Sequence, residues 1–377
     1  MPISSSNYIF TSESVSPGHP DKTCDAISDA LLDFAISKDP FARCAFEAFV
    51  TKDNVIIGGE TTIKGYTLTA HDVEDVIRHT IKNIGHSYEG FHYDDVKITN
   101  LIHRQSPDIA MGVDEKEGKE EGAGDQGIMF GYACRETEEL MPASIYYAHK
   151  ILQNIWNSDL LKKGLGVDAK SQVSLIYENG IPVGCYSVTV SIQHLEDISL
   201  KQVREMVLPI IEATLPKGWL PPEERIYINP TGRFVIGGPV SDTGLTGRKI
   251  IVDTYGGAAP HGGGAFSGKD ATKVDRSAAY MARYIAKNIV AANLAEKCTI
   301  QLSYVIGISK PVSVYVNTHG PGKISDDEII KIINQKLDLS PKGIRTYLQL
   351  NRPIYLPTSS FGHFGRKGFS WEETGIF

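Results

Sequence analysis

The stretch "SQVSLIYENGIPVGCYSVTVSIQ", residues 171–193, decides the fold of this chain. Two runs rich in β-branched residues lie on either side of Asn179-Gly180, a strong signal for a tight β-hairpin turn. The segments on its two sides, 142–161 and 199–215, are predicted to be helices, and Pro209 is a potential kink in the second. Predicted strands at 127–135 and 224–238 complete a unit with the order βαββαβ.

Patterns of the same order occur on both sides of this unit. In the first third of the chain, Ile27, Ala30, Leu31 and Phe34 recur at helical spacing. The predicted elements there are strand 7–15, helix 20–38, strands 43–51 and 54–62, helix 72–84 and strand 95–103. The last third contains strand 248–255, helix 276–296, hairpin 298–318, a helix at 325–339 that begins with a Ser-x-x-Glu capping box, and a closing strand at 352–358.

The repeated order predicts an α+β protein with three similar βαββαβ domains around a pseudo-threefold axis. A period above 100 residues is too long for a solenoid. The predicted domains are 1–105, 128–240 and 241–377, and the Gly- and acid-rich segment 106–127 is predicted to be a mobile lid or linker. The hairpin strands carry more apolar residues than one covered face needs, so we expect an oligomer packed sheet to sheet.

Composition and charge narrow the classes of function. The chain has 377 residues, of which 41% are hydrophobic, and a formal net charge of −7, which argues against bulk nucleic-acid binding. The five cysteines are scattered and form no C-x-x-C motif, as expected for reduced thiols rather than a disulfide frame or a zinc site. With neither a signal-peptide pattern nor an apolar run long enough for a membrane span, the expected location is cytoplasmic.

The glycine-rich segment "GGGAFSGKD", residues 262–270, suggests a phosphate site. From Gly263 it follows the P-loop spacing G-x-x-x-x-G-K, but Asp270 stands where Ser or Thr is required. A P-loop also directly follows a buried strand of a parallel sheet, whereas here a glycine-rich stretch intervenes. Lys269 and Lys273 are four residues apart and would share a face near a helix N-terminus, where anions bind. A solvated lysine pair is the alternative interpretation.

Two pairs of polar residues could contribute to the same site as these lysines. His19 and Asp21 flank Pro20 at a strand-to-helix turn, where they could bind a phosphate and a metal ion, or cap the helix. Arg248 and Lys249 stand at the start of a predicted strand, where they could grip a polyphosphate or provide ordinary surface charge.

Four further residues are candidates for binding a ligand or a metal ion. Asp275 has the chemistry to bind a hard cation such as Mg²⁺, and Lys170 could bind phosphate or remain a surface charge. Asp125 among glycines could contact a ligand or form an Asx turn, and Phe234 could stack on a base or pack in a core. Together these groups fit Mg²⁺-polyphosphate chemistry, which leaves two alternatives: a Mg²⁺-dependent phosphoryl-transfer enzyme or NTPase, and a non-enzymatic assembly protein that binds a nucleotide.

The motifs, taken in order, resemble those of the S-adenosylmethionine synthetase (methionine adenosyltransferase) family. They are "GHPDK" at 18–22, "GAGDQG" at 122–127, "DAKSQV" at 168–173, "INPTGRFVIGGP" at 228–239, "TGRKIIVDTYGG" at 246–257 and "GGGAFSGKD" at 262–270. The resemblance covers essentially the whole chain. It implies the family's three-domain fold and a homodimer or dimer of dimers with active sites shared across a sheet interface.

The resemblance also implies the reaction. Methionine sulfur would attack C5′ of ATP, the whole triphosphate would leave, and it would then be hydrolysed to phosphate and diphosphate. Two Mg²⁺ ions per site would be required and K⁺ would activate. Because a thioether is a neutral, modest nucleophile, the protein's main task would be to position it and to stabilise the leaving oxyanion.

Carried over by motif, the resemblance assigns a role to each candidate residue. His19 would donate to the departing O5′, and Asp21 and Asp275 would hold Mg²⁺. The triphosphate would be gripped by Lys170, Arg248, Lys249, Lys269 and Lys273, and Glu47 would line the K⁺ site. Methionine would be bound by Glu60, Gln105, Asp125, Asp242 and Lys273, with Asp242 also at ATP, and adenine would be contacted by Phe234 and Ile306.

The chain departs from the family pattern near the predicted lid. Met111 follows Ala110 where Gln is common before the Gly, and His103-Arg104 stands where small or uncharged residues are expected. These departures leave the presumed chemical residues intact. We expect them to affect lid kinetics or a subunit contact.

Overall fold

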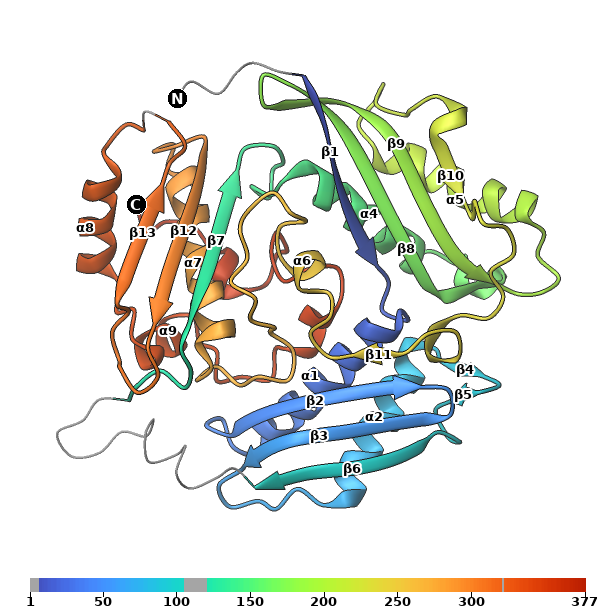
Figure 1. The fold of residues 1–377 in the computed structure, drawn as a ribbon, viewed down its shortest axis with the longest axis horizontal. Coiled ribbons are helices and arrows are strands. Elements are labelled where there is room, and N and C mark those ends of the chain that lie inside the picture. The colour runs from blue at the N-terminus through green and yellow to red at the C-terminus, as the bar shows by residue number, and fades with distance from the viewer. Residues whose placement is uncertain (1–6, 105–120, 321) are drawn as a thin grey trace.

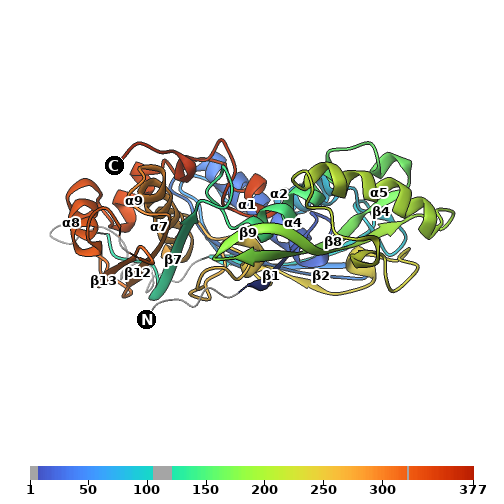
Figure 2. The same cartoon turned by 90° about the horizontal axis from the view of Figure 1, so that it is seen from above.

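A computed structural model describes residues 7–104, 121–320 and 322–377 (Figure 1). Three main β-sheets lie around a central region, and the helices gather on one side of them (Figure 2). The element order confirms the predicted α+β fold with three similar units. None of the helices in the described ranges has the length and apolar character that crossing a membrane requires.

The N-terminal unit is a sheet covered by two helices. Its elements are α1 (Pro20–Lys38), β2 (Arg43–Thr51), β3 (Asn54–Thr62), α2 (Ala70–Ile84) and β6 (Lys97–Arg104), with a small hairpin of β4 (Ser87–Tyr88) and β5 (Phe91–His92). α1 begins where the His19 ring accepts a hydrogen bond from the backbone N–H of Asp21, and Pro20 takes the first helical position. α2 begins with a Thr69–Asp72 capping box.

The central unit contains the hairpin on which the fold prediction rests. β8 (Leu165–Glu178) and β9 (Ile181–His194) are joined by Asn179 (φ 53°) and Gly180 (φ 79°), both in the left-handed region that a type I′ turn requires. The hairpin prediction is therefore confirmed. The other elements of this unit are α4 (Ala143–Trp156), α5 (Leu200–Thr214) and β10 (Ile226–Ile228), which pairs in parallel with β9.

The C-terminal unit has the same plan. Its elements are α7 (Val274–Ala291), β12 (Lys297–Tyr304), β13 (Ser313–Asn317), α8 (Asp326–Lys336) and α9 (Pro341–Tyr347). The Ser325 hydroxyl accepts a hydrogen bond from the backbone N–H of Glu328 at the start of α8, which confirms the predicted helix start.

The opening strand of each unit lies in the sheet of another unit. β1 (Tyr8–Val15) pairs with β8, β7 (Gly127–Cys134) pairs with β12, and β11 (Gly244–Leu245) pairs with β2. The three units are therefore interlocked along the chain (Figure 1). The boundaries 1–105, 128–240 and 241–377 stay a prediction, and most of the predicted lid 106–127 lies outside the described residues.

The strand predicted at 248–255 is wrong. The segment forms the short helix α6 (Ile250–Asp253) instead. Two tertiary effects explain the difference. β11 already occupies the edge of the N-terminal sheet next to β2, and the carboxylate of Asp253 is drawn into the interior by an ion pair with Lys22.

Two other predicted strands are wholly or largely absent. Residues 352–358 end in a 3-10 turn at Leu356–Ser359, because the Asp33 carboxylate accepts the backbone N–H groups of Tyr355 and Leu356. In the segment 224–238, only Ile226–Ile228 forms a strand. There the Asn229 side chain bonds both backbone groups of Ile192 and ends the ladder (φ 45° at Asn229).

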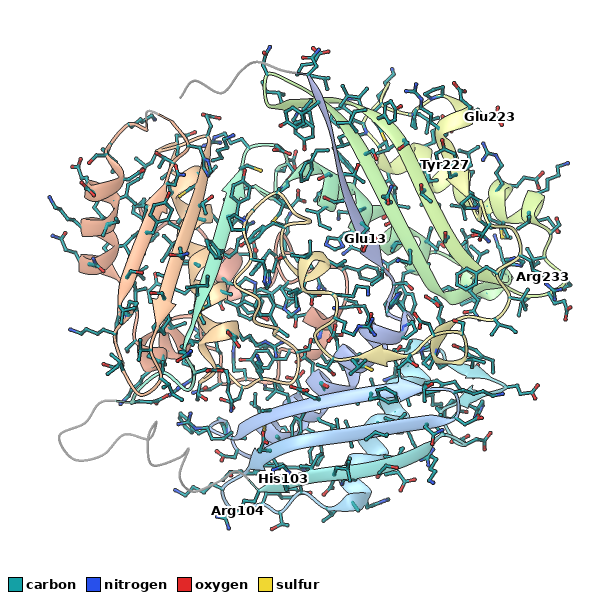
Figure 3. The ribbon with its side chains drawn as sticks, viewed as in Figure 1. Glu13, His103, Arg104, Glu223, Tyr227 and Arg233 are labelled. Carbon is teal, nitrogen blue, oxygen red and sulfur yellow. The ribbon has the colours of Figure 1, made fainter. Side chains whose placement is uncertain are left out.

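The uncovered side of the sheets carries exposed apolar side chains at alternate strand positions. Leu101 of β6 is 61% exposed, although a large aliphatic side chain on a covered sheet face would be buried. Other exposed large apolar side chains on strands are Ile9, Ile56, Ile128, Tyr227 and Tyr315. Figure 3 shows Tyr227 on β10, together with Glu13 on β1. Such a surface is typical of an interface with another chain.

Burial of His86 predicts a contribution to acid sensitivity. Its ring bonds the hydroxyls of Thr23 and Tyr88 inside the molecule, and burial lowers its pKa to about 3. The unfolded chain, with an ordinary histidine pKa near 6.5, therefore takes up a proton as the pH falls below about 6.5. This contribution to stability is present above that pH and is lost as the pH falls toward the folded value.

We therefore expect His86→Gln to reduce the pH dependence of stability. Between pH 7 and pH 5.5, the free energy of unfolding of the parent should change by about 1 kcal/mol more than that of the variant, in the destabilising direction. Urea denaturation at both pH values measures this difference. His71, which is exposed on α2, gives the matched control His71→Gln, for which the parental pH dependence should persist. Equal pH dependence of the parent and His86→Gln would contradict the prediction.

Candidate active site

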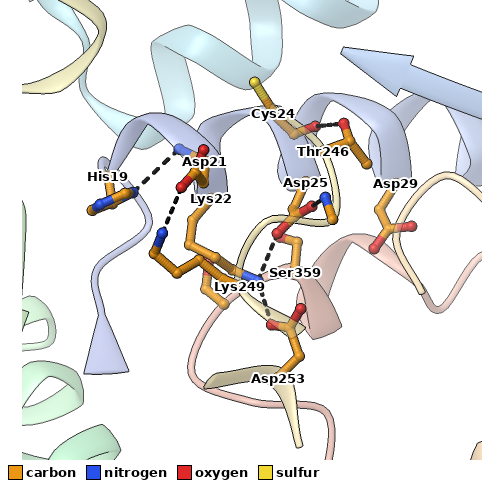
Figure 4. Close-up of polar contacts among 12 residues, drawn as sticks. His19, Asp21, Lys22, Cys24, Asp25, Asp29, Thr246, Lys249, Asp253 and Ser359 are labelled. Atoms are coloured by element: carbon orange, nitrogen blue, oxygen red, sulfur yellow. Dashed lines mark hydrogen bonds and ion pairs between the residues drawn. The ribbon is translucent and has the colours of Figure 1, made fainter. Parts of the chain in front are cut away.

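The first group of candidate residues, which we call the α1 cluster, comprises His19, Asp21, Lys170, Arg248 and Lys249. Lys249 Nζ lies 2.5 Å from one carboxylate oxygen of the buried Asp21 (Figure 4). Arg248 Nη1 lies 3.8 Å from the other oxygen. Burial alone would raise the pKa of Asp21, but the hydrogen bond from Lys249 holds it below the ordinary value. Asp21 is therefore a carboxylate at neutral pH, with two cations beside it.

β11 can approach the first turn of α1 because it contains Gly244. A side chain at this position would come within 2.2 Å of the carbonyl oxygen of Pro20. The backbone N–H of Leu245 can then donate to the Asp21 carboxylate at 3.0 Å. This contact places Arg248 and Lys249, which follow three and four residues later, beside the helix N-terminus.

Electrostatics define the protonation state of His19. Burial, followed by the charge of Lys249, lowers its pKa to about 3, so the ring is neutral at physiological pH. Its Nδ1 accepts the backbone N–H of Asp21 at 3.2 Å. A neutral ring that accepts at Nδ1 carries its hydrogen on Nε2. His19 is therefore a fixed neutral hydrogen-bond donor at Nε2.

Lys170 joins the α1 cluster through sheet pairing. It stands opposite Val15 at the end of β1, and its Nζ lies 3.9 Å from the Glu13 carboxylate (Figure 3). The neighbouring Asp168 was missed as a candidate. Its carboxylate accepts the backbone N–H of Gly238 at 2.7 Å, and burial raises its pKa to about 6. Asp242 lies close enough to add to this rise in pKa, although it is itself exposed.

The second group, which we call the α7 cluster, comprises Lys269, Lys273, Asp270 and Asp275. α7 begins at Val274, so both lysines precede the helix and do not share one of its faces as predicted. Lys269 Nζ lies 2.7 Å from the carboxylate of Asp275 in the first turn, and Lys273 Nζ lies 2.5 Å from that of Asp270. The arrangement still presents two ammonium groups at a helix N-terminus.

Asp270 has a structural role that explains why it stands in place of a P-loop Ser or Thr. Its buried carboxylate accepts the backbone N–H groups of Cys44 and Thr272 and pairs with Lys273. Gly268 (φ 80°) lies directly against β2, where a side chain would come within 2.0 Å of the Phe46 carbonyl oxygen. The glycine-rich loop thus packs closely on the N-terminal sheet.

Several candidates from other segments lie next to the α7 cluster. Ala123 forms a parallel bridge with Ile306, and a side chain at Gly124 would contact the backbone of Thr272, so the "GAGDQG" turn with exposed Asp125 borders the cluster. Lys269 forms a bridge with Ala45 of β2, which stands opposite Glu60 of β3.

The remaining candidates lie on the sheets or outside the described chain. Glu47 is exposed on β2, and Glu60 lies 3.5 Å from His103 at the end of β6 (Figure 3). Phe234 is half-buried in the loop after β10, where its backbone bonds His194. Gln105 and Met111 lie outside the described residues.

The two clusters lie at different places along α1. Asp21 is in its first turn, whereas Asp29 of the third turn accepts the backbone N–H of Gly268. Eight residues of α-helix correspond to about 12 Å. Within the described ranges, no group of three or more His, Cys, Asp or Glu side chains converges as protein ligands of a metal would.

Comparison with known proteins decides the family. Three family models, described as the N-terminal, central and C-terminal domains of S-adenosylmethionine synthetase, match residues 7–107, 120–234 and 236–373. The chain belongs to the S-adenosylmethionine synthetase family. The S-adenosylmethionine synthase of Parvibaculum lavamentivorans is 57% identical over 98% of this chain and 97% of its own length. S-adenosylmethionine synthase 2 of Rhodospirillum rubrum is 57% identical, and the synthase of Maricaulis maris is 54% identical, each over 99% of this chain and at least 97% of the relative.

The predicted family membership is thus confirmed over the whole length of the chain. S-adenosylmethionine synthetases are metal-dependent enzymes. In this member of the family, the separate carboxylates Asp21 and Asp275 each contact a lysine rather than another acid. A donor set of this kind suits a cation that takes most of its ligands from a substrate.

Proposed function

We propose that this chain makes S-adenosylmethionine from ATP and L-methionine. The methionine sulfur attacks C5′ of ATP, the triphosphate leaves as a unit, and its hydrolysis gives phosphate and diphosphate. The observation that carries the proposal is the match of all three family domains, in order, to a chain whose basic residues gather at two helix N-termini. The rival phosphoryl-transfer enzyme lacks this support, because the loop with P-loop spacing packs through Asp270 as a structural element.

In the proposed mechanism, the residues of the α1 cluster stabilise the leaving group. Arg248, Lys249 and Lys170 bind the triphosphate oxygens, which carry growing negative charge as the C5′–O bond breaks. His19 donates a hydrogen bond from Nε2 to the departing O5′. A neutral donor already oriented by the Asp21 backbone needs no reorganisation at the moment of transfer.

The α7 cluster completes the phosphate site in this proposal. Lys269 and Lys273 meet the triphosphate from the start of α7, where the helix dipole also favours an anion. Asp21 and Asp275 would hold two Mg²⁺ ions, consistent with the preference of Mg²⁺ for one or two carboxylates together with phosphate oxygens. When bound, Mg²⁺ neutralises charge on the triphosphate. Glu47, exposed on β2, would line a K⁺ site.

The remaining candidate residues bind methionine and adenine in this proposal. Methionine is bound by Glu60, Gln105, Asp125, Asp242 and Lys273, and adenine contacts Phe234 and Ile306. The border between the "GAGDQG" turn and the α7 cluster supports a place for methionine near the phosphates. The stretch "QSPDIAMGVD", residues 105–114, would act as the gating lid, within the predicted lid or linker region that extends to residue 127.

We further propose that two copies pack through the uncovered side of their sheets, as a dimer or a dimer of dimers. Each active site would combine the α1 cluster of one copy with the α7 cluster of the other. The exposed apolar strand residues and the separation of the clusters along α1 support this arrangement. We place the enzyme in the cytoplasm, in keeping with five free cysteines, all of them buried.

One assay tests the function. Purified protein is incubated with ATP, methionine, Mg²⁺ and K⁺, and the products are separated by chromatography and analysed for phosphate. We expect S-adenosylmethionine with equal amounts of phosphate and diphosphate. Formation of ADP, or a product that does not depend on methionine, would support the phosphoryl-transfer alternative and refute the proposal. Nucleotide binding without turnover would indicate the non-enzymatic alternative.

Leu101→Glu should disrupt the assembly. The new charge would be buried in the proposed interface on β6, where an unpaired carboxylate is strongly unfavourable. Light scattering should show the parent as a dimer or larger species and the variant shifted to monomer, with at least tenfold lower turnover. Leu195→Glu, an exposed leucine in the loop after β9, is the control that should keep the parental size. A fully active monomer would contradict shared active sites.

A further inference from the structure

Lys22 is a fully buried lysine directly behind the α1 cluster. Its Nζ lies 2.8 Å from Oδ2 of Asp25 and 2.5 Å from Oδ1 of Asp253 (Figure 4). Taking a lysine and two carboxylates out of water is costly, so breaking such a group leaves an uncompensated buried charge. Lys22 follows Asp21 by one residue, but its side chain points into the protein, away from solvent.

Of the two carboxylates beside Lys22, Asp25 on α1 contacts the start of the segment that carries Arg248 and Lys249, and Asp253 belongs to its far end. Asp25 accepts the backbone N–H of Gly247 at 2.9 Å, just before Arg248. Asp253 ends α6, just after Lys249. The Lys22 ammonium thus contacts the carboxylate that holds the near end, Asp25, and the carboxylate of the far end, Asp253 (Figure 4).

Other contacts between the segment and α1 lie mostly before Arg248, apart from the Lys249–Asp21 pair. Leu245 donates to Asp21, and the Thr246 hydroxyl bonds the Ser28 hydroxyl and the Cys24 carbonyl. These contacts hold the part before Arg248. At the far end of the segment, the Asp253 side chain meets Lys22 and, at 3.9 Å, Nε2 of His363. His363 is buried, and this nitrogen makes no hydrogen bond.

Lys22 remains the cation that holds Asp253. Its ammonium lies within 2.8 Å of both the Asp25 and the Asp253 carboxylates. Burial lowers the pKa of His363 well below its ordinary value, so that ring is neutral. At the far end, the Lys22–Asp253 pair is the side-chain ion pair, beside one backbone hydrogen bond from the His363 N–H to the Asp253 carbonyl oxygen at 3.0 Å.

We propose that Lys22 is a positioning residue for triphosphate binding. Through Asp25 and Asp253, it sets where Arg248 and Lys249 stand relative to His19 and Asp21. It touches no substrate itself. The inference rests on the proposed function, because it assumes that Arg248 and Lys249 bind the leaving triphosphate.

The test uses Asp253→Asn, which removes the charge at the far end and leaves the Lys22–Asp25 pair in place. Calorimetry with inorganic tripolyphosphate measures the phosphate site without the transfer reaction. We expect at least tenfold weaker tripolyphosphate binding and at least tenfold lower kcat, with KM for methionine within twofold of the parent.

A second variant, Lys22→Met combined with Asp25→Asn and Asp253→Asn, leaves no buried charge in the group. It should show the same pattern, and it provides the test if Asp253→Asn does not fold.

The matched control is Glu372→Gln, which weakens another buried ion-pair group, with Arg283 and Lys287, far along the chain. It should lower the unfolding temperature while kcat and tripolyphosphate affinity stay near parental values. If a folded Asp253→Asn variant behaves like this control, Lys22 is only structural and the inference is overturned. A parent that binds no tripolyphosphate and makes no S-adenosylmethionine would instead refute the proposed function.

Discussion

Lys269→Ala should lower the turnover number for S-adenosylmethionine formation by about 100- to 1000-fold, the usual cost of removing one preorganised group that stabilises developing charge. Lys269 Nζ stands 2.7 Å from Asp275 at the start of α7, where the proposal places the leaving triphosphate. The fold should survive, because the side chain is only partly buried. Apart from the pair with Asp275, its contacts are made by its backbone, including the carbonyl that accepts from Arg276.

Steady-state kinetics with ATP and methionine measure the effect, and circular dichroism checks that the variant is folded. The matched control is Lys162→Ala, which removes an exposed lysine paired with Asp159 at 3.0 Å. Its turnover should equal that of the parent. An unchanged turnover number in Lys269→Ala would remove this lysine from the proposed phosphate site.

Arg276→Met should reduce the free energy of unfolding by about 3–5 kcal/mol, the cost of breaking a buried ion pair and leaving its partner charged. The Arg276 guanidinium makes two bonds to the Asp29 carboxylate, at 2.7 and 3.0 Å, and neither side chain is exposed. It also stacks on Tyr355, with its central carbon 4.2 Å from the ring centre. This contact joins α1 of the N-terminal unit to α7 of the C-terminal unit.

Urea denaturation of Arg276→Met against the parent measures the loss. Lys201→Met is the control, because Lys201 forms an exposed pair with Glu205 at 3.8 Å, and a surface pair contributes about 1 kcal/mol at most. The double variant Asp29→Asn, Arg276→Met should recover much of the stability, since no unpaired charge remains. A loss in Arg276→Met no larger than that of the control would show that the pair does not hold the two units together.

Predictions from local pattern succeeded where neighbouring residues determine the structure. The helix predicted at 20–38 has these bounds in the structure, because Pro20 and the His19 cap are adjacent in sequence. The turn at Asn179-Gly180 forms as predicted, since its two positive φ angles depend on those two residues alone. The cap at Ser325 is equally local.

Predictions of secondary structure failed where a contact with a residue distant in sequence determines the local structure. The segment 248–255 has the composition of a strand, yet Asp253 is drawn inward by Lys22, which lies 231 residues earlier in the chain. The strand predicted at 224–238 stops early because the Asn229 side chain replaces the ladder bonds to Ile192. Neither contact leaves a periodic signal in the sequence.

For the candidate site too, local motifs predicted one part and tertiary structure decided the other. Motifs such as "GHPDK" and "GGGAFSGKD" were sufficient to identify the family and the kind of chemistry, because they retain the residue types that phosphate binding needs. Tertiary structure alone decided that Asp21 is met by Lys249 across 228 positions, that Asp270 supports the backbone of β2, and that the candidates form two clusters along α1. The physical reason is that side-chain neighbours in a site are set by strand pairing and helix packing between distant segments, whereas a local pattern records only what each segment can do alone.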